Sequence, residues 1–112
     1  MNIEKFLGML GLARRAGKVI IGTSEVCLSM PRGKTRLVIV SDEASAATKK
    51  KLTTKCDFYG IKRITVSVGI SELGRRLGKT YTPACVAVTD EGFAAQLFKL
   101  AESTEATNTA EI

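Results

Sequence analysis

Histidine and tryptophan are absent from this 112-residue chain, and cysteine occurs at only three positions, Cys27, Cys56 and Cys85. Without histidine or a Cys-x-x-Cys pair, the sequence does not indicate a zinc site, and the wide spacing does not indicate a disulfide framework. We expect three buried thiols in a reducing cell. There is also no Gly-x-Ser-x-Gly elbow, no glycine-rich phosphate loop and no activated cysteine partner. These absences predict a protein that is not an enzyme and uses no cofactor, metal or small-molecule substrate.

Long hydrophobic runs are absent as well. No stretch approaches the roughly 18 apolar residues of a membrane span, and the first residues are too charged for a secretory signal. We therefore expect a cytoplasmic protein without membrane contact. At 112 residues and 45% hydrophobic content, the chain is long enough for one domain with a core and too short for two. We expect a single α/β domain at residues 1–101 and a flexible acidic tail at residues 102–112, where Ser, Thr, Ala and Glu dominate.

Acidic side chains are few compared with basic ones. The chain has 17 Lys and Arg against 11 Asp and Glu, and three of those acids lie in the last eleven residues, so residues 1–101 hold 17 basic and 8 acidic side chains. This balance favours a polyanionic partner. A basic composition does not identify that partner, because many small proteins are basic for solubility.

Helical and β-branched patterns alternate along the chain and predict an α/β fold, a mostly parallel or mixed sheet with helices on both faces. Helices are expected from Ile3 to a Gly17 cap, from Gly22 toward Gly33, from Ala47 to Tyr59 with a Gly60 cap, from a Ser71-Glu72 cap to Gly78, and from Glu91 to Leu100. Strands are expected at residues 19–21, 36–40, 64–68 and 84–89. The hydroxyls of Thr23 and Ser24 are expected to cap the second helix.

Loops at one end of such a sheet collect functional groups, and the candidates are the loops near Gly22, at Ser41 to Ala44 and at Thr80 to Ala84. We expect these three loops to lie together. The lysine-rich segment Lys49–Lys51 with Lys55 is interpreted as a solvated helix face and is left outside the site.

Four segments, in this order and spacing, resemble the kink-turn-binding ribosomal protein family of the L-seven-Ae type over about residues 3–100. They are GTSEV at residues 22–26, RGKTRLVIV at 32–40, ELGRRLGK at 72–79 and VAV at 86–88. Within that match, LGLARRAGK at residues 10–18 and TDEGFA at 89–94 look most similar to the bacterial YlxQ-like branch.

The resemblance implies a three-layer α/β/α sandwich with a four-stranded mixed sheet, which binds sharply bent RNA (a kink-turn) at sheared G·A pairs in ribosomal or other structured RNA. It implies that Gly22 lets the RNA backbone approach, that a helix start reads the bases through Ser24 and Glu25, and that basic side chains hold phosphates. Arg14 could join those phosphate contacts. The loop at residues 82–84 would pack on a strained nucleotide, although it is also compatible with a plain turn. The expected RNA-binding residues are Lys18, Gly22, Thr23, Ser24, Glu25, Leu28, Arg32, Lys34, Thr82, Pro83 and Ala84.

Three positions depart from the family pattern. Ser24 stands where the family usually has Asn, Leu28 where it has Lys, and Ile70 where other members often carry Lys. A serine hydroxyl offers fewer hydrogen bonds than an amide, and a leucine cannot contact a guanine as lysine does. One lost contact of this kind costs about 1–3 kcal/mol, which would weaken binding or change the preferred RNA.

Other classes stay open. The residues from Thr23 to Glu25 also form an ordinary helix start. The chain could be a protein-interaction module of a ribosome or transcription complex with only non-specific RNA affinity. A signalling receiver with Asp42 as phosphoacceptor is disfavoured, because the first strand offers no acidic pair for a metal. We expect a monomer.

Overall fold

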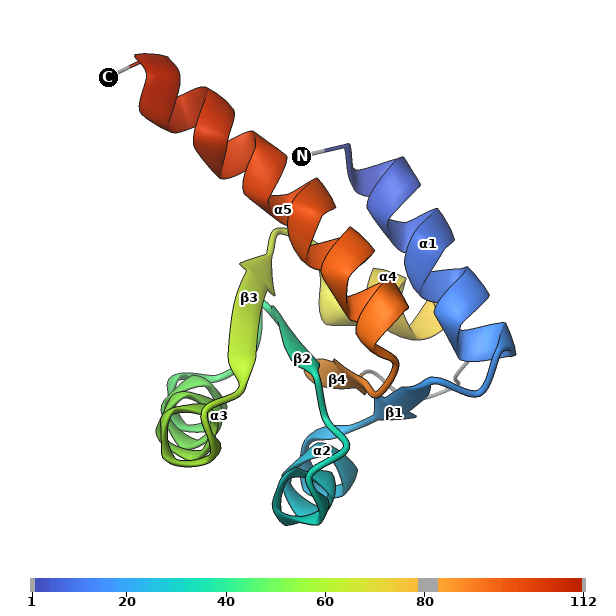
Figure 1. Cartoon of the computed structure of the whole chain (residues 1–112), viewed down its shortest axis with the longest axis vertical. Coiled ribbons are helices and arrows are strands. Elements are labelled where there is room, and N and C mark those ends of the chain that lie inside the picture. The colour runs from blue at the N-terminus through green and yellow to red at the C-terminus, as the bar shows by residue number, and fades with distance from the viewer. Residues whose placement is uncertain (1, 79–82, 112) are drawn as a thin grey trace.

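A sheet lies between two layers of helices in the computed structural model, which describes residues 2–78 and 83–111 and the side chains as far as residue 101 (Figure 1). In the described part of the chain the strands are β1 (Val19–Ile21), β2 (Leu37–Ser41), β3 (Lys62–Val66) and β4 (Cys85–Val88). The helices are α1 (Ile3–Arg15), α2 (Thr23–Ser29), the 3-10 helix η1 (Met30–Arg32), α3 (Ala46–Tyr59), α4 (Ile70–Arg76) and α5 (Glu91–Glu111).

The strands form one mixed sheet in the order β1-β4-β2-β3. β2 and β3 are parallel, whereas β4 runs antiparallel to both of its neighbours, β1 and β2. The carboxyl ends of β1, β2 and β3 therefore lie at the end of the sheet where β4 begins. The predicted fold class is confirmed.

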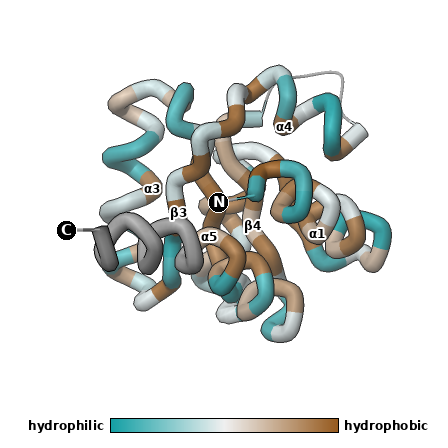
Figure 2. The backbone as a smooth tube through the Cα atoms, turned by 90° about the horizontal axis from the view of Figure 1, so that it is seen from above, coloured by the Kyte–Doolittle hydropathy of each residue, from teal (hydrophilic) through white to brown (hydrophobic). Residues whose placement is uncertain are grey.

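The sheet separates two hydrophobic cores, as alternation along β2 shows. Leu37 and Ile39 point into a core shared with α1, α4 and α5, whereas Val38 and Val40 point into a core shared with α2 and α3. Successive side chains of a strand face opposite sides, so a strand covered on both faces is apolar throughout. Figure 2 shows the hydrophobic colour gathered on the strands between the helices.

Several predicted element boundaries are shifted, and the clearest differences concern β3 and the last helix. β3 is Lys62–Val66 rather than residues 64–68. It is an edge strand, and the exposed Lys62 and Arg63 pair with β2 in a position where charged side chains are tolerated. The last helix continues to Glu111 rather than ending at Leu100. The expectation that residues 102–112 form a flexible tail stays a prediction.

Both predicted N-terminal helix caps are also wrong, whereas the Gly60 cap at the end of α3 is confirmed. The N-cap of α2 is Gly22, without a side-chain cap among the described residues, so the Thr23 and Ser24 hydroxyls do not cap this helix. The N-cap of α4 is Gly69 rather than the expected Ser71-Glu72 pair. The Ile70 amide instead donates to the Glu43 carboxylate at 3.1 Å, from the loop after β2. A cap supplied by a distant segment is not visible in local sequence.

The three cysteines are free thiols, as expected, but only two are buried. Cys56 and Cys85 lie in the core on the α2 and α3 side, whereas Cys27 is half-buried. None of the helices in the described ranges combines the length and apolar character that a bilayer crossing needs.

Candidate nucleic-acid interface

The start of α2, the loop at residues 41–44 and the described part of the third candidate loop, Pro83 and Ala84, meet at one end of the sheet, as expected from the sequence. The Gly22 amide donates to the Cys85 carbonyl at 3.1 Å, and the Ser41 amide donates to the Ala84 carbonyl at 2.9 Å. These bonds continue the pairing of β4 with β1 and β2, in which Ile21 faces Val86. The start of α2, the loop after β2 and the segment before β4 therefore form one surface.

Gly22 makes the turn from β1 into α2 with φ +102° and ψ 146°. Residues that carry a side chain rarely adopt this backbone conformation, so the turn requires glycine. A Cβ at Gly22 would meet no atom within 4 Å, which means that the space above the turn is open. Because no side chain caps the helix among the described residues, the first-turn amides of α2 face this open space with the positive end of the helix dipole.

The first turn of α2 consists of Thr23, Ser24 and Glu25, which differ in their contacts with the rest of the fold. The Thr23 hydroxyl accepts a hydrogen bond from the Cys85 thiol at 3.7 Å, so it is tied to the fold. Ser24 and Glu25 are exposed, and neither side chain has a hydrogen bond or ion pair among the described residues. A free serine hydroxyl and a free carboxylate are both available for recognising polar base edges.

The segment before β4 is only partly available at this surface. Pro83 is buried and Ala84 is half-buried, with its carbonyl already bonded to Ser41. Thr82, the remaining expected loop residue, lies outside the described residues. Of the described part, the Ala84 side chain is therefore the apolar group that remains partly accessible next to the start of α2.

The expected phosphate-binding cations do not gather around Glu25. Lys18 precedes β1, and its carbonyl accepts from the Thr89 amide at 2.9 Å, beyond the far end of β4. Arg32 ends η1 and Lys34 precedes β2, so these exposed side chains also lie at the end of the sheet opposite Gly22. Arg14 is half-buried, and its Nε donates to the Leu77 carbonyl at 2.8 Å, which gives it a structural bond.

Two lysines outside the predicted site, Lys51 and Lys55, lie beside it. Lys51 and Lys55 of α3 line an open groove of about 450 Å³ between α3 and α2, opposite Ser24 and Leu28. The spacing of four residues places Lys51 and Lys55 on one face of α3, just as it places Ser24 and Leu28 on one face of α2. The signal that would have identified them is this shared spacing, but the sequence does not show that the two faces meet.

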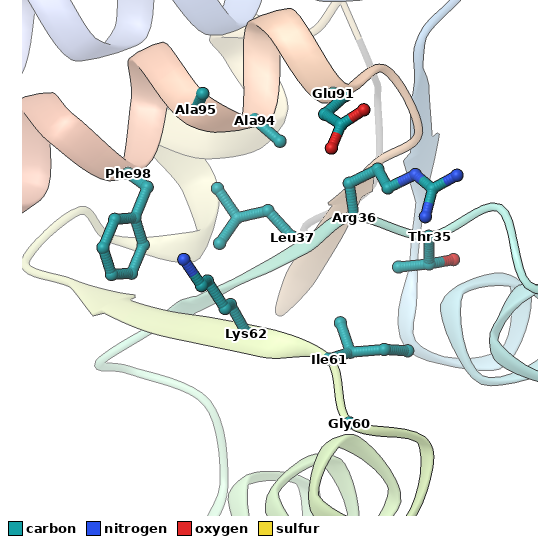
Figure 3. A pocket seen from close by; sticks show the side chains of 10 residues that line it. All are labelled: Thr35, Arg36, Leu37, Gly60, Ile61, Lys62, Glu91, Ala94, Ala95 and Phe98. Carbon is teal, nitrogen blue, oxygen red and sulfur yellow. The ribbon is translucent and has the colours of Figure 1, made fainter.

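A second hollow, of about 280 Å³, lies between α5 and the starts of β2 and β3, away from Gly22 (Figure 3). Its Lys62 ammonium sits over the Phe98 ring, 4.6 Å from the centroid, and Figure 3 shows this side chain pointing toward Phe98. The carboxylate of Glu91 lines the same hollow. None of the expected RNA-binding residues that the structure describes lines it, so it is separate from the candidate interface.

Residues 4–98 match the model of the ribosomal protein L7Ae/L30e/S12e/Gadd45 family. The chain belongs to this family. It is 39% identical over 100 residues to the RNA-binding protein YlxQ of Bacillus subtilis. The aligned region covers 89% of this chain and 98% of that protein. It is also 30% identical over 89 residues to the large ribosomal subunit protein eL30 of Sulfolobus acidocaldarius, covering 80% and 86% of the two chains. The similarity to the bacterial YlxQ-like branch is thereby confirmed.

Two solved structures share the fold of this family member. A protein of unknown function from Bacillus halodurans aligns with a TM-score of 0.81 and 38% identity, over 88% of this chain and 97% of that one. A 15.5 kDa RNA-binding protein of Giardia lamblia aligns with a TM-score of 0.73 at 18% identity, over 87% and 84% of the two chains. The named sequence relatives are RNA-binding and ribosomal proteins rather than enzymes, in agreement with the expectation that this chain is not an enzyme.

Proposed function

We propose that this protein binds structured RNA and recognises a kink-turn or a related sharply bent motif through the surface at the start of α2. The observation that carries the proposal is the Glu25 carboxylate, which is exposed beside the open turn at Gly22 and has no hydrogen bond or ion pair to any residue that the structure describes. The family membership and the names of the YlxQ and eL30 relatives support RNA as the ligand and a ribosomal or translational setting. A cytoplasmic location is part of the same proposal, and the monomeric state stays a prediction that light scattering can check.

Glu25 is proposed to select the RNA rather than to attract it. A carboxylate repels phosphates, but it accepts hydrogen bonds from the exposed amino group of a guanine. The first-turn amides and the positive end of the α2 dipole would lie against the nearby backbone, where Gly22 leaves room. Glu25 would therefore contribute preference for one RNA over another.

The test is a titration of the protein against a kink-turn RNA and against a control in which Watson–Crick pairs replace the sheared G·A pairs, at near-physiological salt with Mg²⁺. We expect tighter binding to the kink-turn, and a loss of about tenfold or more of that preference in Glu25→Gln. Glu91→Gln, which removes an exposed carboxylate on α5 at the other end of the sheet, is the matched control and should keep the preference.

Equal, weak and salt-sensitive binding of the wild-type protein to both RNAs would contradict the proposal. That result would favour the alternative of a protein-interaction module with only non-specific RNA affinity. The salt dependence is informative because phosphate contacts lose affinity steeply as salt rises, whereas an apolar protein interface does not.

A further inference from the structure

The groove between α2 and α3 starts at the proposed RNA-binding surface and has a lining unlike the rest of that surface. Its described lining combines the polar Ser24, the lysines Lys51 and Lys55, and an apolar floor of Cys27, Leu28, Pro31 and Tyr59. Leu28 is 58% exposed, and together with Cys27, Pro31 and Tyr59 it gives the groove a continuous apolar part. The groove therefore offers both positive charge and apolar contact surface.

The charge of the groove favours a polyanion over an apolar protein segment. Among the described residues that line it, two are basic and none is acidic. Neither the Lys51 nor the Lys55 ammonium group has a hydrogen bond or ion pair in the described part of the chain, in contrast to Lys49, whose ammonium donates a hydrogen bond to the backbone carbonyl of Asp42 at 2.7 Å. Two unpaired ammonium groups on one helix face are suited to successive phosphates of a nucleic-acid strand.

The apolar floor favours unpaired bases over a double-stranded stem. The bases of a duplex are stacked inside it, so a stem would reach the lysines but would leave the floor uncovered. Tyr59 lines the groove, and its ring forms a T-shaped pair with the 80% exposed ring of Phe58, at 4.8 Å between centroids. Aromatic side chains beside basic ones are typical of surfaces on which single-stranded bases stack.

The groove also leads from the proposed RNA-binding surface toward Arg32 and Lys34. Its described lining on α2 and η1 runs from Ser24 to Pro31, over which the chain rises about 11 Å. This length matches about three stacked nucleotides. Its far end, at Pro31, is directly followed by Arg32, with Lys34 two residues later.

We infer that the α2–α3 groove holds a single-stranded continuation of the bound RNA, with Lys51 and Lys55 on its phosphates and Leu28 and Tyr59 beneath its bases. The inference rests on the proposed function, because the strand continues from a motif held at Glu25. It adds a second element to the target: a bent motif followed by unpaired nucleotides that run toward Arg32.

The experiment uses the full chain and a kink-turn RNA with blunt stems, compared with derivatives that each carry five unpaired nucleotides on one strand end. We expect wild-type protein to bind at least one derivative about five- to tenfold tighter than the blunt RNA. In Lys51→Gln/Lys55→Gln that gain should disappear, and the slope of log affinity against log salt on that derivative should fall by about 1.4. Lys5→Gln/Lys50→Gln makes the same charge change at exposed positions outside the groove and should keep the gain.

The outcomes separate this inference from the proposed function. If the protein prefers the kink-turn over its Watson–Crick control but no derivative binds more tightly, the groove inference is wrong and the proposed function stands. The inference is equally wrong if the gain survives in the Lys51/Lys55 variant, and the groove is then left for a protein partner. If the kink-turn preference itself is missing, the proposed function fails and the inference fails with it.

Discussion

Replacing Gly22 by alanine tests whether the turn into α2 depends on backbone conformation alone. With φ +102° and ψ 146°, Gly22 lies outside the left-handed region that other residues visit. The added Cβ would meet nothing within 4 Å, so steric contact with the rest of the fold contributes nothing to the cost. Strain of this kind costs about 1–3 kcal/mol. We expect a loss of about 2 kcal/mol in the free energy of unfolding.

Two other glycines provide matched controls for this prediction. Gly11 lies inside α1 without a positive φ and also has open space around it, so Gly11→Ala should leave stability unchanged or raise it by up to about 1 kcal/mol. Gly60 ends α3 with φ +67° and ψ 35°, inside the left-handed region that asparagine tolerates. Gly60→Asn should therefore cost clearly less than Gly22→Asn.

The assay is thermal unfolding of the variants under identical conditions, combined with the kink-turn titration. For a chain of this length, about 2 kcal/mol corresponds to a fall of about 8 °C in Tm. RNA affinity should fall as well at a temperature where Gly22→Ala is still folded, because relief of the strain would move the first-turn amides. The reasoning is refuted if Gly22→Ala unfolds at the wild-type temperature, or if Gly22→Asn and Gly60→Asn cost the same.

Three further predictions concern single side chains. Leu28→Lys supplies the cation that the family usually carries, so titration should show an affinity for the kink-turn RNA that is about tenfold higher. Leu12→Lys, at a similarly exposed leucine on α1, is the control and should not raise this affinity. Equal effects of the two substitutions would show a general effect of charge. Burial raises the pKa of the Cys85 thiol to about 11, so iodoacetamide at pH 8 should label the half-buried Cys27 first, as mass spectrometry of the folded protein can check. Because the folded-state pKa of Cys85 is raised, its contribution to stability is complete below about pH 9 and should be lost as the pH rises through 11, which unfolding curves at several pH values would reveal.

The central strand shows why much of the fold could be predicted from the sequence. Leu37 to Val40 are all apolar, and a run of this kind is stable only when both faces of a strand are covered. The structure covers one face with α1, α4 and α5 and the other with α2 and α3, which gives the expected layers. Gly60, where local conformation decides the helix end, was also predicted correctly.

Prediction from the sequence was less successful where tertiary contacts decide. The Glu43 carboxylate caps α4 from a distance of 27 residues along the chain, so no pattern near Ile70 reveals it. The start of β3 was missed because Lys62 and Arg63 resemble loop residues, although an edge strand accepts them. Lys51 is exposed, as predicted, but its position opposite Ser24 could not be predicted, because only the folded chain places α3 against α2.

The arrangement of charge along α2 separates selection from attraction in a way that can be measured. Glu25 lies at the start of the helix, the lysines Lys51 and Lys55 lie along its side, and Arg32 follows its far end. A carboxylate that reads a base changes the ratio of two affinities, whereas an ammonium group on a phosphate changes the salt dependence of each. Glu25→Gln should therefore abolish the preference for the kink-turn while leaving its salt slope nearly unchanged. Lys51→Gln/Lys55→Gln should reduce the slope on RNA with an unpaired extension while keeping the preference. If both variants changed both quantities alike, the RNA would not be bound in two separate parts along α2.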